Sequence, residues 1–580
     1  MLEFIHLLKQ RYQIIFSGLI KEHVLSAVYQ ERIEQITLAE AFFHKTEIVD
    51  GQPSMPVNIV IIGPTQVGKS SIVNLILGET AADVSPLAGY TIHPQGFGCG
   101  LSAKANDWLN EYFCDYKQLQ QQQMDKTQQR CFSYNDSASC GVSDCIIWDT
   151  PDFDSIDSNG YREGLLKAIA LADIVVLVLS KEKYADQSVW TMMSLLQTMQ
   201  QPTLVVINKL IESAQSVILN SLQEKWRQAR SDKVAVCIPL LYNKAGFKEQ
   251  ERLAVNTSIE QLRQHIKREK YAVYQQQFLL QYWQAWTEPV VAELTARQDW
   301  VGLIEDSMEQ ALVVYKRDYL DHPHHYETFQ NALVELLTLL EIPGLSTVMA
   351  KTRRVLTWPV RKIFNLTGSA ASGLSESSQE IVLLNQISEH LLIQLSDRLL
   401  DKIDQESDRV QWWKDLNVIL RRQRAVILQQ FRKSALKYHD DFQQQVDTTA
   451  QRLYNKLKDQ PLTLNSLRAT RITTDAAVVA LALKTGGIGL HDLVITPAML
   501  SVTSFLAESA IGSYVHKLEA ELKQRQQQTV RQTLFQAVLH SALVQLPEMM
   551  ADSRHFNIPP LQFSHAEQAV TGKPNGLRIL

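Results

Sequence analysis

The sequence lacks several features that would assign it to a protein class at once. It has only six cysteines and no Cys-x-x-Cys pair, so a structural zinc site has little support and reduced thiols are expected. Its formal net charge of -5 gives no reason to expect a nucleic acid partner. The first residues have the spacing of an amphipathic helix without a cleavage-site pattern, which argues against a secretory signal and favours a cytoplasmic protein.

The chain of 580 residues is too long for one ordinary core, and its hydrophobic pattern changes along its length. Short apolar runs alternate with longer polar or amphipathic stretches up to about residue 250, which is typical of buried parallel strands joined by helices. The predicted strands are 57–62, 145–148, 174–179, 204–207 and 234–238. Beyond residue 256 the strand pattern ends, and Leu384, Ile387, Leu391 and Leu395 recur at helical spacing.

These patterns predict a fold that combines an α/β part with an all-α part. The α/β part is a mostly parallel sheet with helices on both faces, and a long helical bundle or stalk follows it. The predicted divisions are an N-terminal helical segment at 1–50, the α/β domain at 51–255, the helical bundle at 256–550 and an irregular tail at 551–580.

A phosphate-binding loop is the most specific motif in the sequence. It follows the predicted strand 57–62 and opens a helix, which is the context that the Walker A pattern requires. Glycines let backbone N–H groups face the phosphates, and a lysine reaches the terminal phosphates. The residues predicted to bind the nucleotide here are Gly63, Pro64, Thr65, Gln66, Val67, Gly68, Lys69, Ser70 and Ser71.

Three further positions predict a Mg²⁺ ion beside this loop. The Ser70 hydroxyl is placed to bind the metal, and Asp149 ends a short apolar strand, as a Walker B carboxylate does. Thr91 lies in a loop between them, where nucleotide switches carry a second hydroxyl ligand. Lys69 and Thr91 are therefore the predicted catalytic residues, and Ser70, Thr91 and Asp149 the predicted metal ligands.

The order of these motifs resembles that of translation-factor-class P-loop GTPases, similar to the Era-like and bacterial dynamin-like branches. Asp149-Thr-Pro-Asp152 resembles the family's Asp-x-x-Gly motif, and Asn208-Lys209-Leu-Ile211 resembles Asn-Lys-x-Asp. The spacing of Thr91 and Pro94 resembles the dynamin-like Thr-x-x-Pro switch. The resemblance implies GTP as ligand, with Asn208, Lys209 and Asn243 bordering the base.

Two departures from the family pattern keep alternatives open. Asp152 replaces the glycine that meets the γ-phosphate, so a nucleotide-binding scaffold without hydrolysis remains an alternative to a GTPase. Ile211 replaces the aspartate that recognises guanine, and a hydrophobic side chain accepts no hydrogen bonds, so ATP is not excluded.

The resemblance to dynamin-like proteins also implies self-association and contact with a membrane from the cytoplasmic side. Residues 343–366 carry basic residues interleaved with aromatic and aliphatic ones, as peripheral membrane segments do. Residues 476–507 have the pattern of an apolar hairpin, but the uncharged run 493–507 is shorter than the roughly 20 residues that span a bilayer. A buried core hairpin is the alternative there, and the analogy with Era-like proteins leaves a ribosome as alternative partner.

Overall fold

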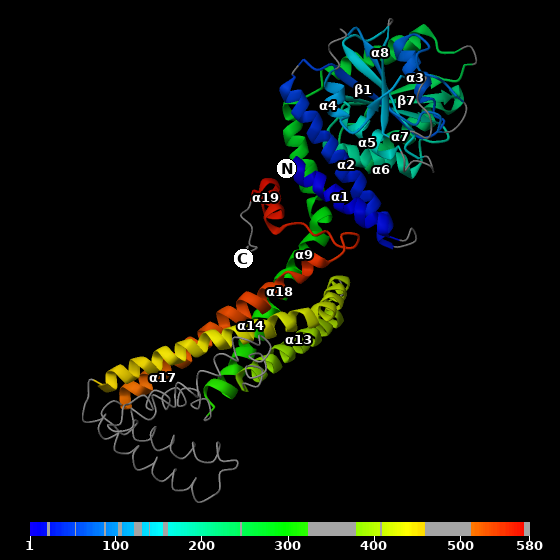
Figure 1. Cartoon of the computed structure of the whole chain (residues 1–580). Coiled ribbons are helices and arrows are strands. Elements are labelled where there is room, and N and C mark those ends of the chain that lie inside the picture. Colours follow the sequence, from blue (N-terminus) through cyan, green and yellow to red (C-terminus); the bar gives the residue numbers. More distant parts are fainter. Residues whose placement is uncertain are drawn as a thin grey trace, which may run out of the picture. The chain divides into compact units, whose positions relative to one another are not determined.

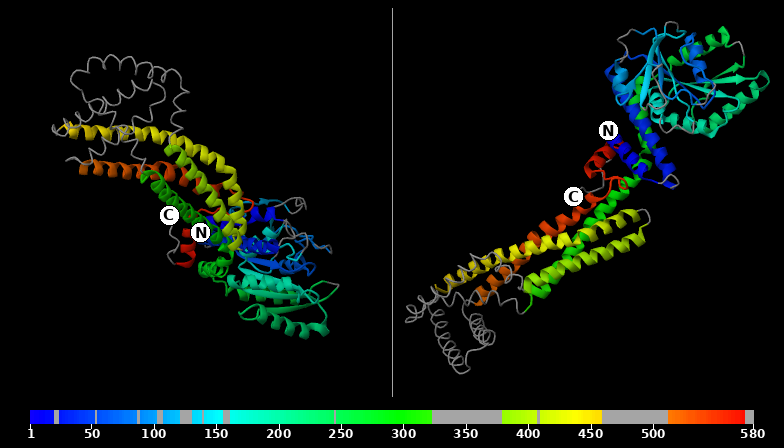
Figure 2. Two further views of the ribbon diagram at one scale, coloured as in Figure 1. Left: turned by 90° about the horizontal axis from the view of Figure 1, so that it is seen from below. Right: turned by 45° about the vertical axis from the view of Figure 1, so that its right-hand side comes forward.

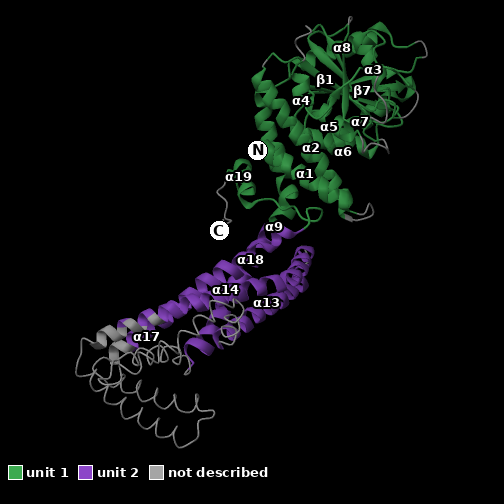
Figure 3. Cartoon of the chain, in the orientation of Figure 1, with its two compact units in different colours: residues 1–291, 551–580 green, residues 292–550 purple. Residues whose placement is uncertain are grey.

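The computed structural model of the chain describes most of its residues (Figure 1, Figure 2). They form two compact units, of which unit 1 comprises residues 1–291 and 551–580, and unit 2 comprises residues 292–550 (Figure 3). The described ranges are 1–19, 24–52, 54–85, 89–101, 107–120, 130–137, 140–154, 161–243, 246–322, 379–406, 409–458 and 512–572.

An eight-stranded sheet forms the centre of unit 1, with the strand order β3-β4-β2-β5-β1-β6-β7-β8 (Figure 1). All neighbouring strands are parallel except β2 and β5. The strands are β1 Val57–Ile62, β2 Gln95–Cys99, β3 Lys117–Gln118, β4 Cys131–Ser137, β5 Cys145–Asp149, β6 Ile174–Ser180, β7 Thr203–Leu210 and β8 Val236–Leu241. The predicted fold class is thus confirmed for this part of the chain, whereas β2, β3 and β4 were not predicted.

Helices cover both faces of the sheet because successive side chains of a strand point to opposite faces. Ile59 and Ile61 of β1 pack with α3 and α8 in one core, while Val60 and Ile62 point to the other face, where α5 and α6 lie (Figure 1). The helices next to the sheet are α3 Lys69–Leu77, α4 Trp108–Tyr112, α5 Arg162–Leu171, α6 Gln187–Leu196, α7 Gln215–Ala229 and α8 Glu249–Arg263.

Helices from distant parts of the sequence complete unit 1. These are α1 Leu2–Gly18, α2 Val24–Gly51, the first part of α9 Tyr271–Tyr315, and α19 Pro560–Thr571. The Tyr12 hydroxyl donates a hydrogen bond to the carbonyl of Trp286 over 2.7 Å, and the rings of Phe4 and Phe563 lie 6.2 Å apart. The tail predicted to be irregular therefore contains a helix, and the prediction was wrong on that point because α19 is stabilised by packing on α1 rather than by its own length.

A buried carboxylate, that of Asp173, joins two of these helices and the side chain of Arg268 to the sheet. Its Oδ1 lies 2.9 Å from Lys45 Nζ of α2 and accepts a hydrogen bond of 2.5 Å from the Tyr271 hydroxyl of α9. Its Oδ2 lies 2.7 Å from an Arg268 nitrogen and accepts the Asn58 N–H of β1. Burial alone would raise the pKa of Asp173, but the charges of Lys45 and Arg268 and the Tyr271 hydrogen bond lower it to about 2.

Unit 2 is helical throughout its described ranges. It contains the second part of α9 and the helices α13 Gln379–Gln405, α14 Val410–Lys458, α17 Gly512–Val530, a π-helix Arg531–His540 and α18 Ser541–Val544. α13 packs along α14, and both views of Figure 2 show them side by side. The predicted apolar stripe of α13 lies in the core, where Leu384, Leu391 and Leu395 are buried.

Inside unit 2, the carboxylate of Glu380 is the centre of a polar network that connects four helices. It accepts hydrogen bonds from the Tyr315 hydroxyl over 2.7 Å, the Tyr438 hydroxyl over 2.8 Å and the Gln526 amide over 2.9 Å. His439 Nδ1 lies 3.0 Å from its other oxygen. Burial alone would raise the pKa of Glu380, but these hydrogen bonds together hold it below its usual value.

The two segments considered for membrane contact, 343–366 and 476–507, lie outside the described residues. In the ranges that the structure does describe, no helix combines the length and the apolar character needed to cross a bilayer. The boundary predicted at residue 255 also differs from the boundary of unit 1, because unit 1 includes α9 up to residue 291, where Gln275 and Trp286 donate hydrogen bonds to Phe42 and Gln35 of α2.

The expectation of reduced thiols is wrong for one pair. Cys99 and Cys140 form a disulfide, with their Cα atoms 5.6 Å apart. β2 runs antiparallel to β5, which places Cys99 opposite Cys145 and near the loop that leads into β5. Because β2 was not predicted, the sequence gave no sign that two cysteines separated by 41 positions lie close together. Cys145 itself is a buried free thiol.

The Asp173 network generates a stability prediction. Asp173→Asn should lower the free energy of unfolding by about 3–5 kcal/mol at neutral pH, because it leaves the buried Lys45 ammonium without its counter-charge. A carboxyl group whose pKa is lowered in the folded protein stabilises the fold at pH values above the pKa of the same group in the unfolded chain, which is about 4 for aspartate. This contribution should therefore disappear as the pH falls from about 4 towards 2.

Urea unfolding of the full chain, followed by tryptophan fluorescence between pH 2 and 7, measures this effect. Asp552→Asn is the matched control, because Asp552 forms an exposed pair with Arg11 in the same unit and its loss should cost less than about 1 kcal/mol. Equal unfolding of the two variants would contradict the role given to Asp173.

Candidate functional site

The loop between β1 and α3 has a backbone that only particular residues adopt. Gly68 has φ +92° at the start of α3, and Gln66 has φ +63°. A Cβ at Gly63 would lie 2.4 Å from the carbonyl oxygen of Val178, and a Cβ at Gly68 would lie 2.7 Å from the Asn208 amide. Space therefore requires a glycine at position 63, and Gly68 is favoured both by space and by its left-handed conformation. The loop lies at the carboxyl end of β1, where parallel sheets bind their ligands.

The side chain of Lys69 is buried at the base of this loop. Its Nζ donates hydrogen bonds to the carbonyl oxygens of Gly63 over 3.2 Å and Pro64 over 3.4 Å. It also forms a close ion pair with the carboxylate of Asp152. The ammonium group thus has an anionic partner of the chain's own, at the end of the loop where an anion of a ligand would lie.

Ser70, Thr91 and Asp149, the predicted metal ligands, lie together. The Ser70 hydroxyl donates to Asp149 Oδ2 over 2.6 Å, and Thr91 Oγ1 lies 3.5 Å from the same oxygen. Asp149 Oδ1 is buried and has no hydrogen-bond partner. Burial raises the pKa of Asp149 to about 6, against the Ser70 hydrogen bond and the Lys69 charge, which lower it.

This donor set fits a hard divalent cation. Two hydroxyls and a carboxylate with one unused oxygen are the kind of partial ligand set on which Mg²⁺ binds together with water and phosphate oxygens. No cluster of three or more His, Cys, Asp or Glu side chains occurs in the described ranges. A transition-metal centre built from such residues therefore has no support there.

Asp152 occupies the position of the family's glycine and points into the site. One carboxylate oxygen contacts Lys69, and the other accepts the Gly89 N–H over 3.2 Å. The side chain thus points towards the loop that is predicted to hold the phosphates. Gly89 belongs to the same loop as Thr91, so Asp152 connects that loop with the phosphate loop.

Asp154 supports the phosphate loop from the same segment and was not predicted as a site residue. Its Oδ1 accepts hydrogen bonds from both the N–H and the hydroxyl of Thr65, each 2.6 Å long. Its other oxygen lies 3.0 Å from Lys183 Nζ. The sequence offered one sign of this role, because Asp154 lies two residues after the end of the Asp149–Asp152 motif.

The Asn-Lys motif at the end of β7 also contacts the loop. The Asn208 amide donates to the Val67 carbonyl over 3.0 Å, and Lys209 Nζ donates to the Gln66 carbonyl over 2.7 Å. Ile211, which stands where the family has its aspartate, is 53% exposed. Its side chain is therefore open to solvent beside the motif instead of being part of the core.

A small cavity of about 60 Å³ marks where these residues meet. Its lining includes Gln66, Gly68, Lys69, Ser70, Ser71, Thr91 and Asp152. Asn208 and Lys209 lie behind the loop, and Asn243 follows β8, where its carbonyl accepts the Gly246 N–H over 3.2 Å. The residues predicted to bind the phosphates and the metal thus lie together, whereas Asn243 lies further along the same edge of the sheet.

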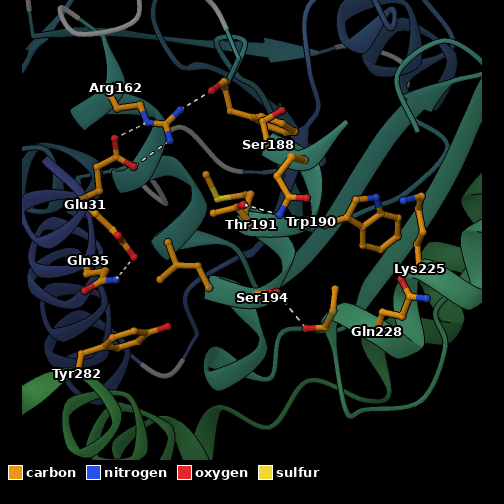
Figure 4. A pocket seen from close by; sticks show the side chains of 16 residues that line it. Glu31, Gln35, Arg162, Ser188, Trp190, Thr191, Ser194, Lys225, Gln228 and Tyr282 are labelled. Atoms are coloured by element: carbon orange, nitrogen blue, oxygen red, sulfur yellow. Dashed lines mark hydrogen bonds and ion pairs between the residues drawn. The ribbon is translucent and has the colours of Figure 1, made fainter. Parts of the chain in front are cut away.

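A larger cavity of about 790 Å³ lies between α2, α6, α7 and α9 within unit 1 (Figure 4). Arg162 on its wall contacts the Phe153 carbonyl, next to Asp152 in the sequence, and its guanidinium forms two hydrogen bonds of 3.1 and 2.8 Å to Glu34 of α2. Arg162 therefore connects the segment after β5 with an N-terminal helix. Arg162 was not among the site residues predicted from the sequence.

The match to a family model agrees with this geometry. Residues 58–209 match the family described as 50S ribosome-binding GTPase. No curated protein matches the chain. Two solved structures of an oligomerised bacterial dynamin pair, described as sensing and tethering membranes, are similar to it at 12% and 13% sequence identity. The alignments cover 92% and 91% of this chain and 91% of each of those chains, with TM-scores of 0.37 and 0.32.

The strand order around β1, the glycine-dependent loop and the family match converge on one assignment. The predicted resemblance is confirmed for the segment that carries the motifs, which is about a quarter of the chain. Unit 1 contains a P-loop GTPase domain.

Proposed function

We propose that this protein is a Mg²⁺-dependent GTPase whose nucleotide state is coupled to its helical part, as in dynamin-like proteins. The observation that carries the proposal is the convergence of Lys69, Ser70, Thr91 and Asp149 at one end of the phosphate loop. Lys69 contacts the β- and γ-phosphates in this proposal, and the backbone of residues 63–68 cradles them.

Ser70, Thr91 and Asp149 would hold the Mg²⁺ ion. The ion supplies charge neutralisation on the β- and γ-phosphate oxygens during phosphoryl transfer. The buried, unpartnered Oδ1 of Asp149 supports this assignment, because a buried carboxylate oxygen without a donor is costly unless another group binds there. The hydroxyls of Ser70 and Thr91 both lie next to the other oxygen of that carboxylate, Oδ2.

Hydrolysis of GTP by the full chain, measured as release of inorganic phosphate, tests the proposal. Lys69→Ala should reduce turnover by about 100-fold or more, because it removes a positive charge from the transferring phosphoryl group. Chelation of Mg²⁺ should have a similar effect. Lys181→Ala is the control, since Lys181 pairs with Glu182 at the end of β6 and lies outside the loop.

A nucleotide-binding scaffold without hydrolysis is the second candidate, and the Lys69–Asp152 ion pair favours it. A lysine held by a carboxylate is less available to a transferring phosphoryl group. Tight GTP binding with turnover no faster than that of Lys69→Ala would establish this candidate and overturn the enzymatic one. Recovery of turnover in Asp152→Gly would identify Asp152 as the cause.

Guanine rather than adenine is the proposed base, and Ile211 makes a specific test possible. Ile211→Asp restores the carboxylate of the family pattern at a position that is already exposed. A hydrogen bond to a charged group contributes about 1.5–3 kcal/mol, so the GTP-to-ATP affinity ratio should rise by about tenfold or more. Competition of both nucleotides against a fluorescent analogue measures this ratio.

Ile211→Val controls for the change at this position, and Glu212→Gln tests the neighbouring carboxylate. A ratio that rises equally in Ile211→Val would show that the added carboxylate does not contact the base. A ratio that falls in Glu212→Gln would show that Glu212 already performs this recognition in the natural sequence.

Coupling to the helices is proposed to pass through Arg162, because its guanidinium joins the Phe153 carbonyl to Glu34 of α2. Arg162→Met should leave nucleotide affinity unchanged and abolish the effect of a non-hydrolysable GTP analogue on hydrogen exchange in residues 24–51. Arg130→Met is the control, since Arg130 has an exposed side chain and pairs with Glu163, the residue after Arg162 in the sequence. A nucleotide effect that persists in Arg162→Met would contradict this route.

A membrane surface is the partner that we propose, and self-association accompanies it. The support is the sequence of residues 343–366, whose basic side chains would each gain about 1 kcal/mol near anionic lipids. Residues 476–507 are a second candidate for the contact. The bacterial dynamin pair is described as tethering membranes, whereas the matching family is described as ribosome-binding. Co-sedimentation with anionic liposomes and with ribosomes decides between the two partners.

A further inference from the structure

Asp152 is the least expected charged residue of the site. It stands at the fourth position of the Asp-x-x-Gly motif, where a glycine leaves space for the terminal phosphate. Its side chain is largely buried and lines the small cavity beside the phosphate loop. A carboxylate in that place adds negative charge to a site that is otherwise built for an anion.

The donors around Asp152 are groups that a phosphate oxygen also uses. Lys69 Nζ pairs with Oδ1, and the Gly89 N–H donates to Oδ2 over 3.2 Å. A carboxylate and a phosphoryl group both present several acceptor oxygens to such donors. The loop that carries Gly89 also carries Thr91, so this single side chain bridges the phosphate loop and the loop of the second hydroxyl ligand.

We propose that Asp152 is a specificity residue that substitutes for the terminal phosphate in the nucleotide-free protein. It occupies the donors of Lys69 and Gly89 until a triphosphate binds and displaces it. Its charge then lies close to the γ-phosphate and lowers the affinity for a triphosphate more than that for a diphosphate. The inference rests on the proposed nucleotide binding and adds to it a residue that distinguishes the two nucleotides.

Asp152→Asn separates charge from shape in this proposal. The amide keeps the size of the side chain and an oxygen acceptor for the Gly89 N–H, but it neither attracts Lys69 nor repels a phosphate. Since juxtaposed like charges disfavour binding strongly, the ratio of triphosphate to diphosphate affinity should rise by about tenfold or more. Asp154→Asn is the matched control, because Asp154 contacts Thr65 and Lys183 and should affect both nucleotides alike.

The measurement is titration of the full chain, in Mg²⁺, with fluorescent GDP and a fluorescent non-hydrolysable GTP analogue. A ratio that increases in Asp152→Asn and not in Asp154→Asn supports the proposal. An unchanged ratio overturns it, as does weaker triphosphate binding in Asp152→Asn, which would make Asp152 a ligand of the metal or of the nucleotide. Failure of the proposed function is a separate result, in which the folded natural protein binds neither nucleotide.

Hydrogen exchange in the nucleotide-free protein supplies a second readout. Asp152→Ala should increase exchange in the peptide that contains Gly89, Thr91 and Pro94, because it removes the acceptor of the Gly89 N–H. Addition of the triphosphate analogue should restore protection, since the terminal phosphate then takes the place of the carboxylate. Exchange that is equal in the natural protein and in Asp152→Ala, without nucleotide, would overturn the substitution of a phosphate by Asp152.

Discussion

The buried charge of Asp173 is the constraint on which the architecture of unit 1 depends. A carboxylate removed from water is costly unless it is paired and hydrogen-bonded, and the partners here come from three separate parts of the chain. Lys45 belongs to α2, Tyr271 begins α9, and the Asn58 N–H belongs to β1. These contacts bind α2 and α9 to the start of β1, while the opposite ends of β1 and β5 carry the site.

At the carboxyl ends of β1 and β5, the carboxylates lie at the candidate nucleotide site instead of joining helices to the sheet. Asp149 and Asp152 face a lysine and two hydroxyls that are suited to a nucleotide and its metal ion. Lys69 and the Gly89 N–H, which would meet a phosphate, have the Asp152 carboxylate as their partner, whereas Asp149 Oδ1 has no hydrogen-bond donor. In the proposed function, binding of a triphosphate is therefore an exchange of partners at these donors. The segment after β5 takes part in this exchange and is linked through Arg162 to α2.

Local sequence was sufficient to predict the phosphate loop, because its glycines, Lys69 and Ser70 all lie between one strand and one helix. It was sufficient for the helical spacing of α13 as well. Long-range pairing could not be predicted in the same way. β2 contains Gly96 and Gly98, which weaken any strand pattern, and its disulfide connects residues that only the antiparallel pairing with β5 brings together. The Arg162–Glu34 contact spans 128 residues, so no motif indicated it.

The Glu380 network has a consequence for how unit 2 can transmit a force. Two tyrosines, a histidine and a glutamine from three other helices converge on one buried carboxylate. Sliding any of these helices by one turn, about 5.4 Å, would strip the carboxylate of a donor and leave a charge unsatisfied in an apolar interior. The four helices that meet at Glu380 are therefore expected to keep their register and to respond to a pull or push as one stiff body.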